Sequence, residues 1–155
     1  MSDSQAIKPY DVCIASDHAG FDQKQQLLVY LAQKGLSLRD AGPLDDRRVD
    51  YPDYAQKVAA EVASRHARFG VLVCGTGIGM AIAANKVTGV RAANATTPDF
   101  AALARQHNDA NVLTLSGRFV SIDTNKAIVD AFLSAQFEGG RHADRVQKII
   151  NLEQS

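Results

Sequence analysis

Val71-Leu72-Val73 runs directly into Cys74-Gly75-Thr76-Gly77-Ile78-Gly79, and this stretch of sequence decides the fold. The three apolar residues predict a buried strand, and residues 80–86 predict a helix after the glycines. Three glycines at alternate positions let the chain turn sharply and bring backbone N–H groups close to a ligand. The start of the next helix adds unpaired N–H groups and a positive dipole end. The stretch therefore predicts a strand–turn–helix unit that binds an anion.

Cys74 lies at the edge of this predicted anion site. Because a helix N-terminus favours the thiolate form, Cys74 is a candidate base in an enzyme. A structural interpretation competes with this one: many glycine-rich turns only allow close helix packing, and a cysteine ending a buried strand is often inert. The spacing is not the dinucleotide fingerprint, because Met80 stands at the last glycine position, and no Gly-Lys-Ser/Thr of a phosphate loop follows. Both interpretations stay open on this stretch alone.

Strand and helix patterns alternate outward from this turn. Short apolar runs predict strands at residues 12–15, 36–38, 70–73, 89–93 and 112–115. Helical spacing and end signals predict helices at residues 21–34, 54–66, 80–86, 97–106, 123–135 and 141–152, with an exposed loop at 42–54. This alternation predicts an α/β fold, a Rossmann-like three-layer sandwich with a five-stranded parallel sheet.

Four segments follow predicted strands: Asp17-His18, the loop Cys74–Gly79, Asn94–Thr97 and Ser116-Gly117-Arg118. In such folds ligands bind at the carboxyl ends of the strands, so these segments are expected on one binding edge. A carboxylate beside an imidazole suits general acid–base work at neutral pH. The alternative for Asp17-His18 is a helix cap followed by a surface histidine.

Two later segments carry further candidates. Residues 105–111 are polar at six of seven positions, and His107 is either a functional group or a cation capping a helix end. Arg141 and Arg145 share one helix face near a predicted N-terminus, where cations are unfavourable. An anion bound there would explain them, because a guanidinium matches a phosphate. The alternative is two solvated arginines.

The composition predicts one globular domain over residues 1–155, with residues 1–9 as a flexible N-terminus. Hydrophobic residues make up 46% of the chain, and 17 basic residues balance 17 acidic ones. This balance gives no general attraction to nucleic acid or membrane. Two cysteines without a metal-binding pattern, no signal peptide, and no apolar run approaching about 20 residues predict a cytoplasmic protein.

Taken in order, the motifs closely resemble the ribose 5-phosphate isomerase type B family, which also includes galactose 6-phosphate isomerase subunits. The resemblance covers about residues 11–150 and rests on residues 16–21, 50–52, 74–79, 84–86, 105–111 and 137–142. It implies a Rossmann-like fold that works as a homodimer or a tetramer of dimers, without metal or cofactor. It also implies an active site between subunits, with the C-terminal helix extending to the partner.

The implied reaction interconverts an aldose phosphate and its ketose through a cis-enediolate. The resemblance makes Cys74 the base, Thr76 a proton relay, His107 the ring-opening acid–base group, and Asp17 its assistant. It makes Asn108 a sugar-orienting residue. Backbone amides would hold the enediolate oxygens at Gly75, Gly77, Ile78 and Gly79. The phosphate would be held by Arg141 and Arg145, with Arg118, His18 and Arg48.

Two departures from the family pattern bear on the chemistry. Some members carry a glutamate base near the end of the glycine loop, whereas this chain has Gly79 there and Cys74 before it, which favours the cysteine mechanism. Asn94–Thr97 replaces a stretch expected to hold a cysteine or small apolar residue, so the sugar stays open among four-, five- and six-carbon phosphates. The non-enzyme alternatives are a nucleotide-binding or regulatory module and a redox sensor at Cys74. The first lacks the acidic ribose-binding residue, because Asn94 stands in its place.

Overall fold

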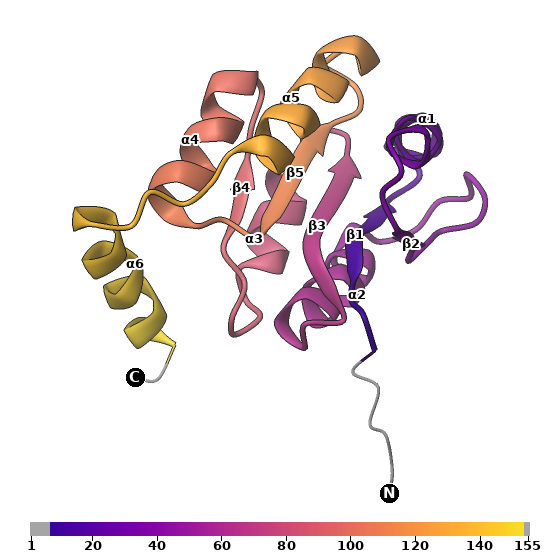
Figure 1. Ribbon diagram of the computed structural model, residues 1–155. Coiled ribbons are helices and arrows are strands. Elements are labelled where there is room, and N and C mark those ends of the chain that lie inside the picture. The colour runs from indigo at the N-terminus through magenta and orange to yellow at the C-terminus, as the bar shows by residue number, and fades with distance from the viewer. Residues whose placement is uncertain (1–6, 154–155) are drawn as a thin grey trace, which may run out of the picture.

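The computed structural model describes residues 7–153 and is built around one parallel β-sheet (Figure 1). The strands are β1 (Tyr10–Ser16), β2 (Leu38–Asp40), β3 (Ala67–Cys74), β4 (Ala92–Asn94) and β5 (Val112–Ser116), in the spatial order β2-β1-β3-β5-β4. All four strand pairs are parallel. The predicted five-stranded parallel sheet is therefore confirmed. Of the expected flexible N-terminus, residues 1–6 lie outside the described residues.

Helices cover both faces of the sheet. They are α1 (Phe21–Gln33), α2 (Tyr51–Ala63), α3 (Ile78–Ala84), α4 (Pro98–Asn108), α5 (Ile122–Ser134) and α6 (Arg141–Leu152). Buried residues of α1, α4 and α5 form one core with the sheet, and those of α2 and α3 form the other. These two cores make the three layers of a Rossmann-like α/β fold (Figure 1).

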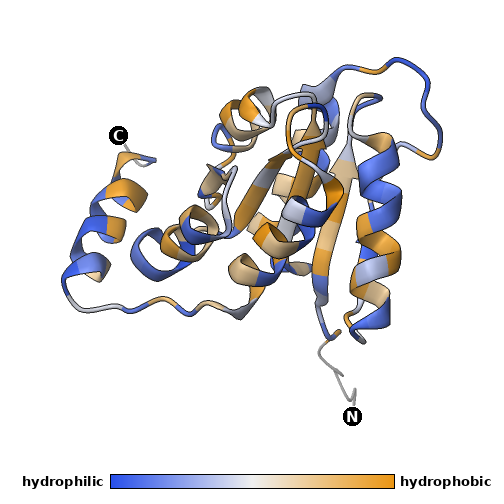
Figure 2. Cartoon of the chain, turned by 90° about the horizontal axis from the view of Figure 1, so that it is seen from above, coloured by the Kyte–Doolittle hydropathy of each residue, from blue (hydrophilic) through white to orange (hydrophobic). Residues whose placement is uncertain are grey.

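The central strand β3 shows why its sequence is apolar without interruption. Val71 and Val73 point into the core under α1, α4 and α5, whereas Leu72 and Cys74 point into the core under α2 and α3. Side chains of a strand alternate between faces, so a strand covered on both sides needs apolar residues at every position. Figure 2 shows this: the strands are mostly hydrophobic, and the helices carry both kinds of residue.

Some predicted boundaries are wrong, mainly at the short elements. Helix α2 begins at Tyr51 instead of residue 54, because Pro52 occupies the first turn, where a fixed φ suits the helix and no N–H is needed. Helix α3 covers Ile78–Ala84 instead of residues 80–86. Strands β2 and β4 have only three residues each and lie two or three residues later than predicted.

Helix α6 stands apart from the sheet. Residues 135–140 cross without regular structure from α5 to α6, and α6 lies against α4 (Figure 1). His142 and Val146 are its buried residues, whereas Ile149 and Leu152 are exposed. Within residues 7–153, no helix is both long and apolar enough to cross a membrane.

Candidate active site

The first half of the candidate site lies where the ends of β1 and β3 diverge. From β1 the chain continues outward to β2, and from β3 it continues toward β4 on the other side. Such a switch point leaves a crevice at the carboxyl ends of the two strands. Asp17 follows β1 and donates its backbone N–H to the Val73 carbonyl at 3.1 Å. Asp17 directly follows β1 and Cys74 ends β3, so both lie at the carboxyl ends of adjacent strands.

The Cys74 thiol receives a hydrogen bond from its own glycine loop. The backbone N–H of Gly77 donates to Cys74 Sγ at 3.1 Å, and the residue is only 4% exposed. This contact fixes the sulfur against the glycine loop. Residues at the end of β5 also hold the loop. The Ser116 hydroxyl donates to the Gly75 carbonyl at 2.8 Å, and the Gly117 N–H donates to the Cys74 carbonyl.

The glycines of this loop are required by close contacts. Gly77 has φ +83°, and a Cβ there would collide with Asn94 Oδ1 and lie 3.0 Å from the Leu115 carbonyl. A Cβ on Gly79 would lie 2.6 Å from the Tyr51 ring. Two of the four amides expected to face a ligand are used within the loop, since the Gly77 N–H donates to Cys74 Sγ and the Ile78 N–H donates to Thr76 Oγ1 at 3.1 Å.

Asp17 is held in the turn that leads into α1. Its buried carboxylate accepts a hydrogen bond from the Gly20 N–H at 3.0 Å. The capping alternative for Asp17 is wrong, because Gly20 is the N-cap of α1 and no side chain caps this helix. The contact instead closes the turn before α1 and fixes one carboxylate oxygen of Asp17.

A loop at residues 41–50 brings basic groups to the same edge. His18 Nδ1 accepts a hydrogen bond from the Val49 N–H at 3.3 Å, next to the exposed Arg48. The start of the loop is fixed by the buried Lys24, whose ammonium lies 2.8 Å from Asp40 Oδ1. Arg118 approaches from β5: its Nη1 lies 3.4 Å from where a Cβ on Gly75 would stand.

The second half of the candidate site lies at the other end of the strands, where they have their amino ends. Helix α4 starts after the carboxyl end of β4 and ends before the amino end of β5, so it runs antiparallel to the strands. His107 and Asn108 are its last residues. Within one chain they are therefore separated from Cys74 by the length of the sheet. Arg141 and Arg145 belong to this second half, because α6 begins beside the end of α4 (Figure 1).

His107 stacks on His142 in this half. The ring centroids are 4.2 Å apart and the ring planes differ by 11°. Glu138 Oε1 lies 3.5 Å from His107 Nε2 and 3.7 Å from His142 Nε2. Burial lowers the pKa of His142, and the positive charges of His107, Arg141 and Arg145 lower it further, while Glu138 opposes them.

These three side chains are also the group whose ligand atoms could hold a metal, since the atoms lie within 4.8 Å of one another. The lone pairs of imidazole nitrogens lie in the ring planes, and here the planes are nearly parallel. The lone pairs therefore run side by side and do not meet at one point, as tetrahedral coordination requires.

The sequence analysis assigned no role to Glu138 or His142. They are four residues apart across Gly139-Gly140, and this spacing is the signal that connects them. The contact of both with His107 depends on how residues 135–140 fold back on α4, where the Glu138 N–H donates to the Gln106 carbonyl at 3.0 Å. No pattern in the sequence around these residues predicts their contact with His107.

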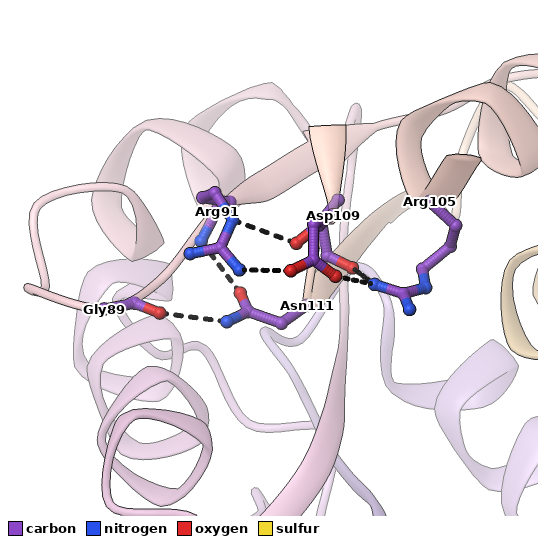
Figure 3. A network of polar contacts seen from close by, with 6 residues as sticks. Gly89, Arg91, Arg105, Asp109 and Asn111 are labelled. Carbon is purple, nitrogen blue, oxygen red and sulfur yellow. Dashed lines mark hydrogen bonds and ion pairs between the residues drawn. The ribbon is translucent and has the colours of Figure 1, made fainter. Parts of the chain in front are cut away.

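An ionic network fixes the end of α4 that carries His107 and Asn108 (Figure 3). Asp109 ends the helix with φ +47°, and its carboxylate accepts from Arg105 at 2.9 Å and from Arg91 at 3.2 Å. Asn111 joins the network by accepting from the Arg91 N–H and donating to the Gly89 carbonyl. The network holds the start of β5 and the end of α4 as one unit.

Comparison with known proteins connects both halves to one family. A family model described as Ribose/Galactose Isomerase matches residues 12–149. Ribose-5-phosphate isomerase B of Escherichia coli K12 is 46% identical over 143 residues, covering 92% of this chain and 96% of that protein. A probable ribose-5-phosphate isomerase B of Mycoplasma pneumoniae is 50% identical over 145 residues, with 93% and 95% coverage.

Solved structures agree with the sequence comparison. A ribose 5-phosphate isomerase from Thermotoga maritima superposes with a TM-score of 0.89 at 49% identity, covering 92% of this chain and 98% of that one. Ribose-5-phosphate isomerase B from Mycoplasma genitalium, solved with bound ribulose-5-phosphate, has a TM-score of 0.88 at 49% identity, with 93% and 96% coverage.

Proposed function

This chain belongs to the ribose/galactose isomerase family, and we propose that it interconverts ribose 5-phosphate and ribulose 5-phosphate. It is an isomerase of the ribose 5-phosphate isomerase B type. One observation carries the proposed chemistry: the Cys74 thiol ends β3 beside a glycine loop and receives the Gly77 N–H on its sulfur. This arrangement supplies a base next to a group of amide donors.

The proposed step is a proton transfer between two carbons. The Cys74 thiolate takes the proton from C2 of the open-chain aldose, and the C1 carbonyl oxygen becomes an enediolate oxygen. Thr76 helps the O2 proton move to O1, Cys74 returns its proton to C1, and C2 becomes the ketose carbonyl. Amides of the Gly75–Gly79 loop other than those of Gly77 and Ile78 would stabilise the negative oxygens, and preorganised donors of this kind contribute about 3–4 kcal/mol each.

The sugar must be opened and held before this step. His107 would open the furanose ring with help from Asp17, and Asn108 would orient the sugar. Arg141 and Arg145, with Arg118, His18 and Arg48, would hold the phosphate. Binding the phosphate away from the reacting carbons supplies energy for positioning them.

These roles require two chains, and we propose a homodimer, or a tetramer of dimers, with each site between subunits. Cys74 and His107 lie at opposite edges of the sheet, so the same chain cannot supply both to one sugar. Exposed apolar residues on α3 and α4 support such an assembly, including Ile78, Ile82 and Phe100. We also propose a cytoplasmic location, which the two free thiols support.

A second substrate remains a candidate because of Asn94. Its side chain lies 3.2 Å from the Thr114 hydroxyl and against Gly77, close to the loop that would face the sugar. A residue there can change the length of sugar that fits. The alternative is therefore another aldose phosphate, such as a tetrose 4-phosphate, allose 6-phosphate or galactose 6-phosphate.

The test is a measurement of kcat/KM for erythrose 4-phosphate, ribose 5-phosphate, allose 6-phosphate and galactose 6-phosphate, in parallel and with EDTA present. We expect a clear preference for ribose 5-phosphate. Preference for another sugar would keep the chemistry and assign the change to Asn94–Thr97. Absence of turnover on all four would favour a binding module.

Variants test the assignments within the site. Cys74→Ala is expected to abolish isomerisation while phosphate-ligand binding survives, and near-normal turnover would contradict a cysteine base.

Arg141→Ala or Arg145→Ala is expected to raise KM more than it lowers kcat. Unchanged kinetics in both arginine variants would place the phosphate elsewhere.

A further inference from the structure

We propose that Glu138 and His142 are positioning residues that set the ring orientation and the proton supply of His107 during opening of the sugar ring. The inference rests on the proposed isomerase function and deepens it. It concerns the stacked pair His107–His142 and the carboxylate beside it. Neither Glu138 nor His142 needs to touch the substrate for this role.

The first role concerns His142, which sets the orientation of the His107 ring. His142 has a side chain only 11% exposed, whereas the His107 side chain is 39% exposed. The buried His142 ring therefore restricts the more exposed His107 ring, which stacks on it with 11° between the ring planes. His142 is itself fixed at the start of α6, where its N–H donates to the Gly139 carbonyl at 3.0 Å. A ring held from one face presents its nitrogen edge in a defined direction.

The second role concerns the charged groups around the two histidine rings. The charged and titratable groups that act on His142 are His107 from α4, Glu138 from the preceding segment, and Arg141 and Arg145 from α6. Burial and the three cationic groups lower the pKa of His142. The pKa of His142 therefore lies below that of an ordinary histidine, so His107 is the ring of the pair that the Glu138 carboxylate is expected to serve.

Glu138 lies within ion-pair distance of His107. Glu138 Oε1 lies 3.5 Å from His107 Nε2, and the Glu138 backbone is tied to α4 through the Gln106 carbonyl. Catalytic hydrogen bonds are often long before substrate binds and shorten in the complex. A carboxylate on one imidazole nitrogen fixes the tautomer and stabilises the cation formed when the ring takes up a proton.

The experiment separates ring opening from the later proton transfer. Ribose 5-phosphate is mainly a furanose, whereas ribulose 5-phosphate is open-chain because its O5 carries the phosphate. Exchange of the C1 protons of ribulose 5-phosphate in D₂O therefore needs Cys74 but no ring chemistry. Each variant is measured for kcat/KM on ribose 5-phosphate and for this exchange rate.

Three variants test the proposal: Glu138→Gln, His142→Ala and His142→Phe. We expect Glu138→Gln and His142→Ala to lower kcat/KM on ribose 5-phosphate by about 10- to 100-fold, with exchange within about twofold of wild type. His142→Phe keeps a stacking ring and should recover a large part of the His142→Ala loss. The matched control is His66→Phe, because His66 also pairs with a glutamate, at 3.8 Å from Glu61, but lies outside the site.

The pH profile provides a readout that a purely structural role would not move. Glu138→Gln removes the negative charge beside His107, so the limb that reports on His107 should move to lower pH by about half a unit or more. His142→Phe keeps the Glu138 charge and removes an imidazole that repels a charged His107, so the same limb should not move to lower pH. A shift to lower pH in Glu138→Gln alone supports the proposal.

Two results would overturn the inference: unchanged kcat/KM and pH profile in all three variants, or equal loss of isomerisation and exchange, which indicates general structural damage. Failure of the proposed function is distinguishable from either. In that case wild type shows neither isomerisation nor exchange, or Cys74→Ala retains exchange.

Discussion

The two cysteines lie in neighbouring strands and face the same core, yet their surroundings give them different chemistry. Cys13 is fully buried in β1, and burial, followed by the negative charge of Glu61, raises the pKa of its thiol to about 12. Cys74 lies one residue before the glycine loop and receives an N–H on its sulfur. The two thiols therefore differ in burial and in hydrogen bonding, and we expect Cys74 to be the more reactive one.

Thiol labelling checks this difference. In the native protein at pH 8, we expect a small alkylating reagent to modify Cys74 and leave Cys13 unmodified, because Cys13 is inaccessible and its high pKa keeps it protonated. Mass spectrometry of the digested protein assigns the site. Cys74→Ala should remove labelling, and full modification of native Cys13 would contradict the argument.

Gly77 is a second residue with a specific demand. Gly77→Ala places a Cβ at φ +83° and against both Asn94 and the Leu115 carbonyl, so we expect a loss of about 3 kcal/mol or more in unfolding free energy, and loss of turnover. The matched control is Gly35→Ala, where φ is +80° but no atom lies within 4 Å. That variant should lose only about 1–2 kcal/mol, and denaturant titration measures both. Equal losses would show that steric contact at Gly77 is unimportant.

At the scale of elements, the end of α4 depends on one carboxylate. Asp109 adopts φ +47°, which aspartate tolerates better than most residues, and it pairs with Arg105, whose side chain is nearly buried. Removal of Asp109 leaves that guanidinium without its carboxylate and loosens the segment that carries His107. Stability and site geometry are therefore coupled at this helix end.

We expect Asp109→Ala to lower the free energy of unfolding by about 2–4 kcal/mol, because the nearly buried Arg105 loses its counter-charge and alanine disfavours a positive φ. Urea titration measures the loss. Asp45→Ala is the control: Asp45 pairs with Arg47 on the surface, and its loss should leave the free energy of unfolding unchanged within error. A similar loss in both variants would contradict a special role for Asp109.

Elements also show how far sequence reasoning reaches. The central strands β1, β3 and β5 were predicted because burial on both faces makes them continuous apolar runs. The edge strands β2 and β4 were misplaced, since three half-exposed residues carry little pattern and pairing with a neighbour sets their position. Motifs within one turn or helix were similarly readable, whereas the contact of His142 with His107 depends on the path of residues 135–140.

At the scale of the whole molecule, the parallel sheet divides the candidate site. Cys74 lies where the strands have their carboxyl ends. His107 lies in the last turn of α4, where the strands have their amino ends, so the two residues cannot meet within the chain. The family resemblance implies a site shared between subunits, and the proposed two-chain site agrees with this separation within one chain. A second copy is the simplest source of the missing half, because identical chains commonly pair about a twofold axis.

Mixed subunits test this arrangement. Cys74→Ala and His107→Ala proteins should each be nearly inactive, because each lacks one half of every site. If the two are unfolded together and refolded in equal amounts, half of the dimers are mixed and each has one intact site, so about a quarter of wild-type activity should return. Refolding each variant alone is the control. Failure of the mixture to regain activity, with dimers confirmed by light scattering, would contradict a shared site.

The position of α4 has one more consequence, which concerns dilution. Its last turn, with His107, projects at the edge of the sheet opposite the glycine loop. Under the proposed assembly, a dissociated chain would keep its fold and both half-sites and yet turn over no sugar. Activity per chain would then follow the law of mass action and decline at low enzyme concentration, although the folded fraction stays constant.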